Sequence, residues 1–543
     1  MGGWTTIQVK MKILTADEMR SVDRVTTERF GVASPDLMHN AGAAVARFVL
    51  REFPERRHIC VLCGKGNNGG DGFVAAHQLD AAGCRVRLLL LGYPADVKGD
   101  AKAAFEEMTL APLIAADEAA LGSSEVQDLL SWSDLLIDAV VGTGFQPPLR
   151  GVAAALRDRV NALHTPVVAI DLPSGWDADS REFAVDGAFR ADAVVTFTAP
   201  KLAHVSGNLT GSATKPIVVA PIGSPADAIE SKTGLTWAGS SKAITEQART
   251  PDANKGLYGH VLLVAGSRGK SGAPAMASLA ALRAGAGLVT AAVPESILAS
   301  VAAITPELMT HPLREGVSGG IDAANLEPEA LRAMLGRATV IAMGPGMGTE
   351  AEAFVLGLIE KTSLPVVLDA DALNILAHHP EKVDGKRRTM VLTPHPGEMA
   401  RLAGISTKEV QARREPLARE FATKHHVTVV LKGWRTLIAH PDGRIAVNTT
   451  GNPGMAKGGS GDILTGIVAA MLGQYPEQPE EAVEAAVYLH GLAADFAVRE
   501  QDEHTLLATD TIGHLFRAFR FRPQDEAGYV WLEGISSSAA RAR

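Results

Sequence analysis

The stretch Asn448-Thr-Thr-Gly-Asn-Pro-Gly-Met-Ala-Lys-Gly-Gly-Ser-Gly-Asp462 is followed directly by the apolar run Ile463-Leu-Thr-Gly-Ile-Val-Ala-Ala-Met-Leu472. Its last glycines precede a helix-like segment, and the first backbone N–H groups of a helix have no partner within the helix. Such a start predicts an anion site suited to phosphate. A carboxylate at Asp462 fits this place if it takes a proton from a hydroxyl that attacks a phosphoryl group. A glycine turn capped by an aspartate is the structural alternative, and the Asn-Thr-Thr-Gly-Asn-Pro-Gly lead-in favours phosphoryl chemistry.

The bulk composition limits the classes of protein to consider. A chain of 543 residues is too long for one core and predicts two or three domains. A hydrophobic content of 46% with 54 glycines is typical of α/β architecture with many strand-to-helix turns. The net charge of −9 argues against a nucleic-acid partner. Phosphate-bearing ligands would have to be held by loop amides and single lysines.

Cysteine usage and hydropathy suggest a location. Three cysteines, Cys60, Cys63 and Cys84, are too few for a disulfide framework and suit a reducing compartment. Cys60 and Cys63 have the spacing of a redox pair, but residues three apart on a strand point to opposite faces, so core packing is favoured. We find no signal-peptide core and no run that could span a bilayer, and we expect a cytoplasmic protein without a membrane partner. Met11 is a possible alternative start, with residues 1–10 as an upstream extension.

Short apolar runs alternate with helix-like stretches along the whole chain. In the first half the runs are Ile59–Leu62, Val86–Leu91, Leu135–Val141, Val167–Ile170, Val194–Phe197 and Ile217–Val219, and in the second half they are Val261–Val264, Leu288–Val293, Val340–Met343, Val366–Leu368, Met390–Leu392 and Val427–Leu431. Continuous apolar strands between helices predict parallel sheets covered on both faces. Ligands then lie beyond the carboxyl ends of the strands.

The breaker-rich segment 221–234 predicts a domain boundary. We therefore expect one domain over residues 1–225 and a second over residues 235–525. Residues 526–543 are expected to form a disordered tail, because the chain turns polar and rich in alanine and serine.

Oxygen-bearing loops follow successive strands of the first half. The loop Gly64-Lys-Gly-Asn-Asn-Gly-Gly-Asp-Gly72 can cradle a pyrophosphate with its amides, although it is not a strict G-x-G-x-x-G motif. Asp138 lies in an apolar run before Gly142-Thr-Gly144, and Asp171 ends another before Leu-Pro-Ser174. Taken alone, each aspartate could equally be a structural cap or a functional site residue. Together Asn67, Asp138 and Ser174 offer the oxygen ligands of an alkali or alkaline-earth ion. Lys201 follows a further strand and is either near the phosphates or solvated.

The second half carries a further set of strand-end motifs. The segment 264–271 ends like a P-loop but has Val264 where the first glycine is required, so we read it as a pocket wall. Two prolines hold His395 in a fixed turn beside Glu398, which favours a ligand or metal-water contact over a structural histidine. Lys432 ends another strand and is a plausible partner for a nucleotide phosphate.

These motifs together resemble the bifunctional NAD(P)H-hydrate repair enzymes. The segments 67–72, 138–144 and 171–175 resemble the epimerase half of that family, and Pro394-His-Pro-Gly-Glu398 with 451–462 resembles its ADP-dependent dehydratase half. The resemblance runs in order from about residue 12 to about residue 522. It implies an α/β fold of two domains, an N-terminal Rossmann-like three-layer sandwich and a C-terminal ribokinase-like domain.

The resemblance also implies a reaction and its site residues. NADH or NADPH hydrated on the nicotinamide ring would be epimerised between R and S forms in the first half, and the S form would be dehydrated in the second. The expected epimerase contacts are Asn67, Asn68, Gly69, Gly70, Asp71, Gly142, Thr143, Gly144, Phe145, Gln146, Pro147, Pro148 and Asp171, with K⁺ on Asn67, Asp138 and Ser174. The expected dehydratase contacts are Ala273, Gly346, His395 and Asp462 for the hydrated cofactor, and Lys432, Gly433, Trp434, Arg435, Thr436, Gly458, Gly459, Ser460 and Gly461 for the nucleotide.

Asp171 and Asp462 are the expected catalytic residues. Hydroxide is a poor leaving group, whereas transfer of a phosphoryl group from ADP to the ring hydroxyl makes the departing group phosphate. Asp462 would deprotonate that hydroxyl, and Mg²⁺ is expected with the nucleotide. Asp171 would contact the hydrated ring and is the candidate for acid/base work.

Two other functions remain open at this point. A ribokinase-like kinase of a small alcohol, fused to a dinucleotide-binding module, would use the same Gly-Gly-Ser-Gly-Asp segment and leave a phosphorylated product. Alternatively, the first half binds a dinucleotide without chemistry. The sequence does not decide NADH against NADPH, ADP against ATP except by analogy, or the number of subunits, although the family tends to form homo-oligomers.

Overall fold

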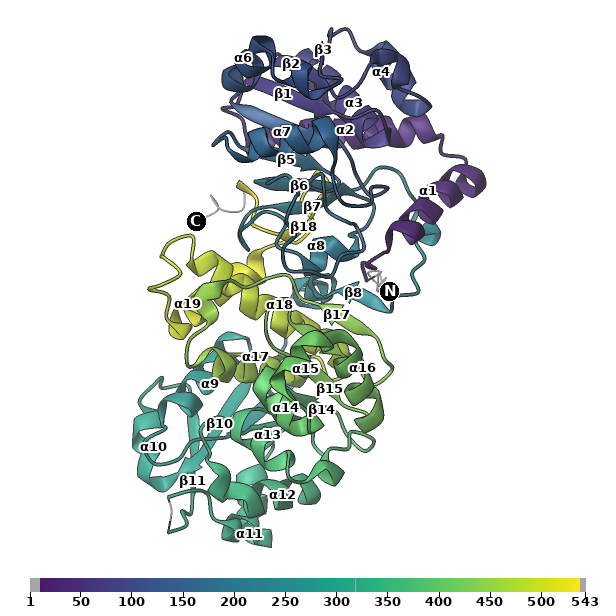
Figure 1. The fold of residues 1–543 in the computed structure, drawn as a ribbon. Coiled ribbons are helices and arrows are strands. Elements are labelled where there is room, and N and C mark those ends of the chain that lie inside the picture. Colours follow the sequence, from purple (N-terminus) through teal and green to yellow (C-terminus); the bar gives the residue numbers. More distant parts are fainter. Residues whose placement is uncertain (1–9, 318, 538–543) are drawn as a thin grey trace. The chain divides into compact units, whose positions relative to one another are not determined.

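The computed structural model describes residues 10–317 and 319–537 (Figure 1). These residues form two compact units. The N-terminal unit comprises Met11–Thr233 and the described residues from Arg522 onward, and the C-terminal unit comprises Gly234–Phe521 together with Lys10. The chain changes unit between Thr233 and Gly234, at the end of the breaker-rich segment. None of the helices in these described ranges is long and apolar enough to cross a membrane.

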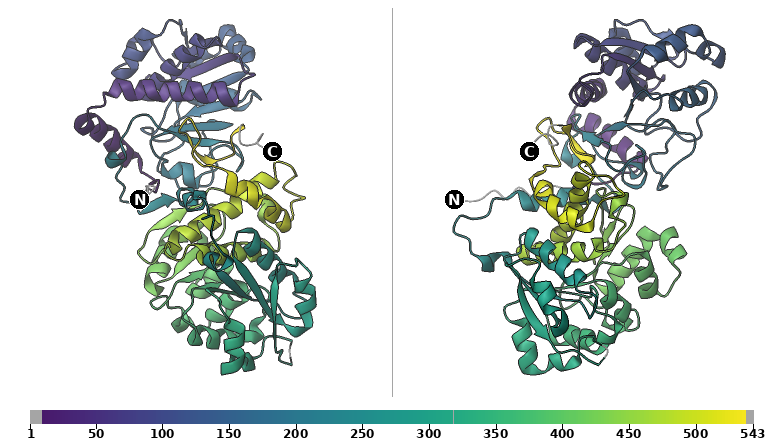
Figure 2. Two further views of the ribbon diagram at one scale, coloured as in Figure 1. Left: turned by 180° about the vertical axis from the view of Figure 1, so that it is seen from behind. Right: turned by 90° about the vertical axis from the view of Figure 1, so that its left-hand side faces the viewer.

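The N-terminal unit is built on a mostly parallel sheet with the order β18-β7-β6-β5-β4-β1-β2-β3. Helices cover both faces of this sheet (Figures 1 and 2). Its strands are β1 His58–Cys63, β2 Arg85–Leu90, β3 Leu113–Ile114, β4 Leu135–Ala139, β5 Val167–Ile170, β6 Ala193–Phe197, β7 Ile217–Ala220 and β18 Val530–Glu533. Its helices are α1 Ala16–Phe30, α2 Ser34–Glu52, α3 Asn67–Ala81, α4 Asp100–Glu107, α5 Glu118–Leu121, α6 Ser124–Trp132, α7 Gly151–Asn161 and α8 Leu202–Ser206. The predicted strands of the first half are confirmed, because buried apolar runs pair where both faces are covered.

The expectation of a disordered tail over 526–543 is wrong for the residues up to 537. Strand β18 adds antiparallel to β7, with Val530 opposite Val219. Tyr529 and Trp531 are buried, and the Tyr529 hydroxyl donates a hydrogen bond of 2.7 Å to the carbonyl of Ala44. Burial of two large aromatic side chains outweighs the polar composition around them. Residues 538–543 lie outside the described residues.

The C-terminal unit has a sheet of the order β11-β10-β9-β12-β13-β14-β15-β16-β17-β8. Neighbours from β11 to β15 are parallel, and β16 is antiparallel to both β15 and β17. The strands are β8 Leu235–Trp237, β9 His260–Val264, β10 Leu288–Pro294, β11 Met309–Leu313, β12 Val340–Met343, β13 Val366–Leu368, β14 Met390–Leu392, β15 Thr428–Leu431, β16 Leu437–Ala439 and β17 Ile445–Val447. The predicted strands of the second half are thus confirmed, and the chain has the two-domain α/β fold.

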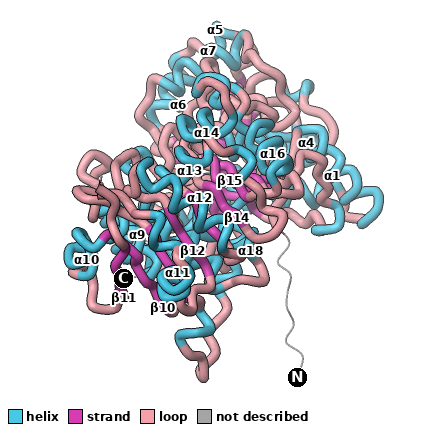
Figure 3. The backbone as a smooth tube through the Cα atoms, turned by 90° about the horizontal axis from the view of Figure 1, so that it is seen from below, coloured by secondary structure: helices cyan, strands magenta, loops and turns pink. Residues whose placement is uncertain are grey.

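Helices surround the strands of the C-terminal sheet, which Figure 3 shows in magenta among cyan. They are α9 Gly272–Arg283, α10 Glu295–Ala302, α11 Pro328–Leu335, α12 Glu352–Lys361, α13 Ala370–Leu376, α14 Pro396–Ala403, α15 Thr407–Ala412, α16 Arg414–His425, α17 Ser460–Gln474, α18 Pro479–Ala497 and α19 Ala508–Arg520. Helix α17 packs against α9 and α18. Gly466 permits this approach, because a Cβ there would lie 2.1 Å from the carbonyl oxygen of Ala277. Close packing on both sides fixes the position of the start of α17.

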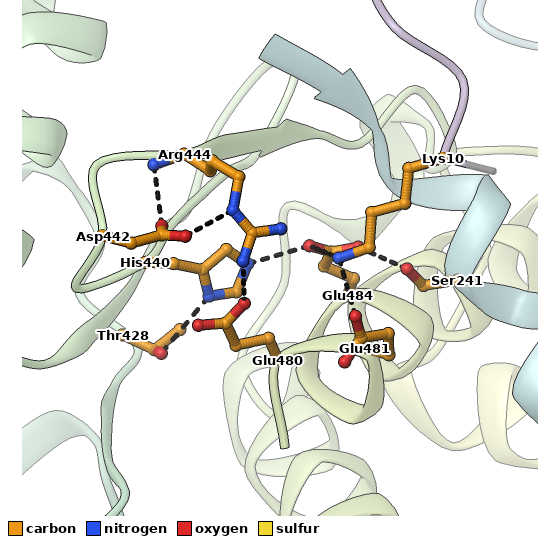
Figure 4. A network of polar contacts seen from close by, with 9 residues as sticks. All are labelled: Lys10, Ser241, Thr428, His440, Asp442, Arg444, Glu480, Glu481 and Glu484. Atoms are coloured by element: carbon orange, nitrogen blue, oxygen red, sulfur yellow. Dashed lines mark hydrogen bonds and ion pairs between the residues drawn. The ribbon is translucent and has the colours of Figure 1, made fainter. Parts of the chain in front are cut away.

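A buried polar network joins several elements of the C-terminal unit (Figure 4). Glu484 on α18 lies 2.9 Å from the ammonium of Lys10 and 2.9 Å from Nε2 of His440, and it also accepts a hydrogen bond from Ser241. Burial would raise the pKa of Glu484, but the hydrogen bond from His440 and the charge of Lys10 hold the pKa below its ordinary value. Lys10 is therefore an integral part of this unit.

The three cysteines are free and buried. Cys60 and Cys63 lie on β1 without any exposed surface, and burial raises the pKa of Cys60 to about 12. A thiol that stays protonated at neutral pH is a poor nucleophile. The predicted role of Cys60 and Cys63 in core packing is confirmed.

Candidate active sites

A cavity of about 650 Å³ opens beside the loops that follow β1, β4 and β5 and beside α1 of the N-terminal unit. Of the predicted epimerase contacts, the cavity is lined by Asn67, Asn68, Gly142, Thr143, Gly144, Phe145 and Asp171. Gly69, Gly70, Asp71, Gln146, Pro147 and Pro148 are not among its lining residues. The three loops meet because the carboxyl ends of parallel strands share one edge of the sheet.

Asp171 lies at the centre of the hydrogen bonding in this cavity. Its backbone is left-handed, with φ of 66°, and its Oδ2 accepts hydrogen bonds from the backbone N–H (2.8 Å) and the hydroxyl of Thr143. Its Oδ1 accepts from the Thr196 hydroxyl at 2.9 Å and from the Lys201 ammonium at 2.8 Å. Burial would raise the pKa of Asp171, but the charge of Lys201 and these hydrogen bonds hold the pKa well below its ordinary value. Asp171 is therefore an ionised group at neutral pH.

Lys201 is buried rather than solvated. It is almost fully buried, and its ammonium group also donates to the Thr196 hydroxyl at 2.7 Å and to the carbonyl of Phe197 at 3.4 Å. The solvated alternative is therefore wrong, whereas a position near the phosphates stays a prediction. Burial of a lysine requires a charged partner, and Asp171 is that partner.

Of the three residues expected to hold potassium, Asp138 and Ser174 are hydrogen-bonded to each other, whereas Asn67 lies at the start of α3. Asp138 is fully buried and accepts hydrogen bonds of 2.7 Å from both the backbone N–H and the hydroxyl of Ser174. Burial raises the pKa of Asp138 to about 6, against the effect of these hydrogen bonds. Asn67 begins α3 and lines the cavity. A buried carboxylate with only neutral donors fits a monovalent cation nearby, because the cation would stabilise the ionised form.

The start of α17 lies in a cluster of charged groups in the C-terminal unit. The Lys432 ammonium is 2.9 Å from Oδ1 of Asp369 and 3.8 Å from Oε2 of Glu398. A Cβ added to Gly461 would lie 3.4 Å from that ammonium. Burial and the charges of Asp369 and Asp371 raise the pKa of Asp462 to about 6, although Lys432 opposes this effect. Asp462 can therefore exchange a proton near neutral pH.

His395 forms part of a helix cap. Its Nδ1 accepts hydrogen bonds from the backbone N–H groups of Gly397 at 3.0 Å and Glu398 at 3.4 Å, which begin α14. The other ring nitrogen lies 3.4 Å from Oε1 of Glu398, and the side chain is 52% exposed. Nδ1 of His395 thus has a structural role, whereas Nε2 lies beside Glu398 and its predicted ligand contact stays a prediction.

A second cavity of about 370 Å³ adjoins this cluster. Of the predicted nucleotide contacts it is lined by Lys432, Gly433, Trp434, Arg435, Thr436, Ser460 and Gly461, but not by Gly458 or Gly459. Ala273, Gly346, His395 and Asp462, predicted for the hydrated cofactor, do not line it. Ala273 and Gly346 are neighbours, because a Cβ on Gly346 would lie 3.3 Å from the Cβ of Ala273. Ala273 and Gly346 therefore form a group of their own outside this cavity, whereas Asp462 directly follows Gly461, which lines it.

Two residues that sequence reasoning missed lie at the 370 Å³ cavity or support its loop. Arg414 on α16 donates to the carbonyls of Trp434 at 2.7 Å and of Leu431 at 3.3 Å, which fixes the loop 432–436. His490 on α18 lines the cavity, and its buried Nε2 has no hydrogen-bond partner within the described part of the chain. Burial and the charge of Lys432 lower the pKa of His490 to about 4. The sequence signal that could have identified His490 is its place within the mostly apolar run 482–497.

Comparison with known proteins gives the following matches. The family described as NAD(P)H-hydrate dehydratase matches residues 261–516, and that described as YjeF-related protein N-terminus matches residues 34–203. The bifunctional NAD(P)H-hydrate repair enzyme of Moorella thermoacetica is 39% identical, with 93% of this chain and 96% of that protein covered. The enzyme of the same description from Escherichia coli is 34% identical, with 94% of each covered. A solved structure, an ADP/ATP-dependent NAD(P)H-hydrate dehydratase from Bacillus subtilis co-crystallized with ATP/Mg2+, is 34% identical, with 52% of this chain and 96% of that chain covered and a TM-score of 0.45.

Proposed function

Because the chain belongs to the family of bifunctional NAD(P)H-hydrate repair enzymes, we propose how its residues divide the work of repair. The N-terminal unit is the epimerase, which interconverts the R and S forms of the hydrated cofactor. The C-terminal unit is the ADP-dependent dehydratase, which acts on the S form. The assignments of individual residues below are our proposal, and they rest on the geometry of the two cavities.

In the epimerase cavity, Asn68, Thr143 and Asp171 are the contacts to the hydrated ring. The support is that all three line one cavity and that the carboxylate of Asp171 is held rigidly by Thr143, Thr196 and Lys201. A carboxylate held in one position by these hydrogen bonds fixes the orientation of the hydrated ring that binds against it. Potassium would be held by oxygens of Asn67, Asp138 and Ser174 and would supply a positive charge beside the buried Asp138.

In the dehydratase, Asp462 removes the proton of the ring hydroxyl, and the oxygen attacks the terminal phosphorus of ADP. The bond from that phosphorus to the bridging oxygen breaks, and AMP leaves. The lone pair of the ring nitrogen then expels phosphate, and loss of a proton from the neighbouring ring carbon restores the double bond of NAD(P)H. The single observation that carries this assignment is the position of Asp462 in the first turn of α17, beside Lys432 and Asp369.

The nucleotide lies in the 370 Å³ cavity in this proposal. Lys432 and the N–H groups at the start of α17 stabilise charge on the transferring phosphoryl group. Ala273, Gly346 and His395, which do not line this cavity, remain the proposed contacts to the hydrated cofactor. Magnesium would enter with the nucleotide and balance its phosphates, and the carboxylates of Asp369 and Glu398 are the nearby groups that suit a hard cation.

The experiment that tests this function uses the purified protein with a mixture of R and S hydrated NADH, K⁺ and Mg²⁺, with and without ADP. Both epimers and NADH are resolved over time. We expect R and S to interconvert without ADP and both to be restored to NADH when ADP is added. Consumption of the S form alone would contradict the proposed epimerase activity. No change in either epimer would contradict both proposed activities.

Location and assembly complete the proposal. The three free, buried thiols and the use of ADP suit a reducing, nucleotide-containing compartment such as the cytoplasm. Assembly into a homo-oligomer, without a nucleic-acid or membrane partner, stays a prediction. Light scattering of the purified protein, with and without ADP, measures the number of subunits.

A further inference from the structure

Asp23 on α1 lies in the epimerase cavity without an assigned role. Its side chain lines the same cavity as Asp171. In residues 10–317 and 319–537 we find no hydrogen bond to its carboxylate, whereas the Asp171 carboxylate accepts four. No sequence motif includes Asp23, which belongs to an amphipathic helix far from the glycine loops along the chain.

The charged groups around Asp23 are two carboxylates, one buried lysine and two exposed basic residues. Asp171 and Asp71 interact with it electrostatically, and so does the ammonium of Lys201. Lys201 already donates to Asp171, Thr196 and Phe197. Arg20 and Lys65 line the cavity as well, and both are exposed to solvent. The cavity therefore holds more negative charge than its one buried cation neutralises.

These surroundings give the three carboxyl groups different pKa values. Burial raises the pKa of Asp23 to about 6, with Lys201 opposing and Asp171 reinforcing the shift. The pKa of Asp171 is held low, and burial with the charges of Asp171 and Asp23 keeps the pKa of Asp71 well above its ordinary value. Carboxyl groups whose surroundings separate their pKa values commonly divide acid/base and electrostatic roles between them.

We propose that Asp23 is the residue that removes and returns the proton during epimerisation, while Asp171 holds the ring. The inference rests on the epimerase function proposed above. Asp23 fits because it lines the cavity and its carboxylate has no hydrogen bond among the described residues, whereas both oxygens of Asp171 accept hydrogen bonds. The acid/base role that the sequence suggested for Asp171 thus passes to a residue on another element.

The chemistry needs one proton and no further reactant. Asp23 takes the proton of the ring hydroxyl, and the oxygen electrons form a carbonyl as the bond from the hydroxyl-bearing carbon to the ring nitrogen breaks. The electron pair of that bond stays on the nitrogen. After rotation of the opened chain, the nitrogen attacks the other face of the carbonyl carbon. The resulting alkoxide takes the proton back from Asp23, which yields the opposite epimer.

Three variants and a control test this assignment in the full-length protein. Asp23→Asn is nearly isosteric and neutral, Asp23→Ser is smaller and neutral, and Asp23→Glu keeps a displaced carboxylate. Asp17→Asn is the control, because Asp17 lies on the same helix, is 85% exposed and pairs with Arg20. The measurement is the initial rate of R-to-S interconversion without ADP, corrected for the uncatalysed rate, between pH 5 and pH 8. Dehydration of the S form with ADP is followed in the same preparations.

We expect Asp23→Asn and Asp23→Ser to lower the kcat of epimerisation at least about 100-fold, as loss of an acid/base group does, with dehydration of the S form unchanged. The wild-type rate should fall below about pH 6 as Asp23 becomes protonated, and Asp23→Glu should keep this acid limb at a lower rate, whereas the neutral variants should lose it. An epimerisation rate within threefold of wild type in either neutral variant would overturn the proposal. If wild type and Asp17→Asn themselves fail to epimerise, the epimerase function is wrong instead.

Discussion

The ammonium nitrogen of Lys201 lies 2.8 Å from Oδ1 of Asp171, and both side chains are buried beside the epimerase cavity. The contact joins the loop after β5 to the residue that precedes α8. It fixes the charge of Asp171, and the ammonium that also interacts with Asp23 is hydrogen-bonded to Asp171 instead. The electrostatic character of this site therefore depends on one ion pair.

Replacement of Lys201 by Met should destabilise the N-terminal unit by about 3–5 kcal/mol, because it leaves a buried charge without its partner. Thermal unfolding at pH 7 measures the change. The control is Lys215→Met, because Lys215 pairs with Asp192 at 2.7 Å near the surface, and loss of such a pair costs about 1 kcal/mol or less. Equal effects of the two substitutions would contradict the prediction.

The same variant should change the response of stability to acid. In the wild type the pKa of Asp171 is lowered, so its ion pair contributes above the unfolded-state pKa of about 4 and this contribution is lost as the pH falls toward the folded-state pKa. Without Lys201, burial raises that pKa, so protonation relieves the buried charge. Unfolding of Lys201→Met from pH 8 to pH 5 should show stability recovering as the pH falls. A deficit relative to wild type that stays constant over this range would argue against it.

Asp462→Asn should lower the kcat of dehydration at least about 100-fold while ADP still binds within threefold of the wild-type affinity. Asn keeps the size of the side chain but cannot accept the hydroxyl proton. Because the pKa of Asp462 is raised to about 6, wild-type dehydration should decline as the pH falls below about 6. Steady-state rates and calorimetric titration with ADP measure the two effects. Unchanged turnover in the variant would remove Asp462 from the mechanism.

His490→Leu should weaken ADP binding about 3–10-fold, the effect of one hydrogen bond, without lowering the stability of the free protein. The buried Nε2 has no partner within the described residues, so its removal costs nothing until a ligand occupies the cavity. Because the pKa of His490 is lowered to about 4, the effect should not vary between pH 6 and pH 8. His504→Gln, at an exposed position, is the control. An affinity equal to wild type would show that the nucleotide does not reach His490.

Ending the chain at Phe521 should abolish epimerisation and leave dehydration of the S form intact. The truncation removes β18 and uncovers the edge of β7. Trp531→Ala is the milder form, and loss of this buried side chain should cost the N-terminal unit about 3–5 kcal/mol. Thermal unfolding and separate assays of the two activities measure the outcome. Full epimerase activity in the truncated protein would mean that β18 is dispensable.

The sequence by itself determined the central parallel strands of both sheets and the loops that follow them, but not the antiparallel strands β16 and β18. Apolar runs such as Val340–Met343 and glycine-rich turns such as 64–72 are local signals, because the residues that form them are close in the chain. The start of α17 and the place of Asp462 followed from the same kind of signal. These positions also carry the motifs by which the chain was assigned to its family.

Only the tertiary structure decided which side chains meet. Tyr529 bonds to Ala44 across 485 positions, so the composition of the final segment could not reveal that it completes the first sheet. Asp23 lines the cavity although its helix carries no motif. One ring nitrogen of His395 accepts the hydrogen bonds of a helix cap. Burial and charge pairing depend on neighbours that lie far apart in sequence, and they determine that Lys201 neutralises Asp171 while Asp23 is left free.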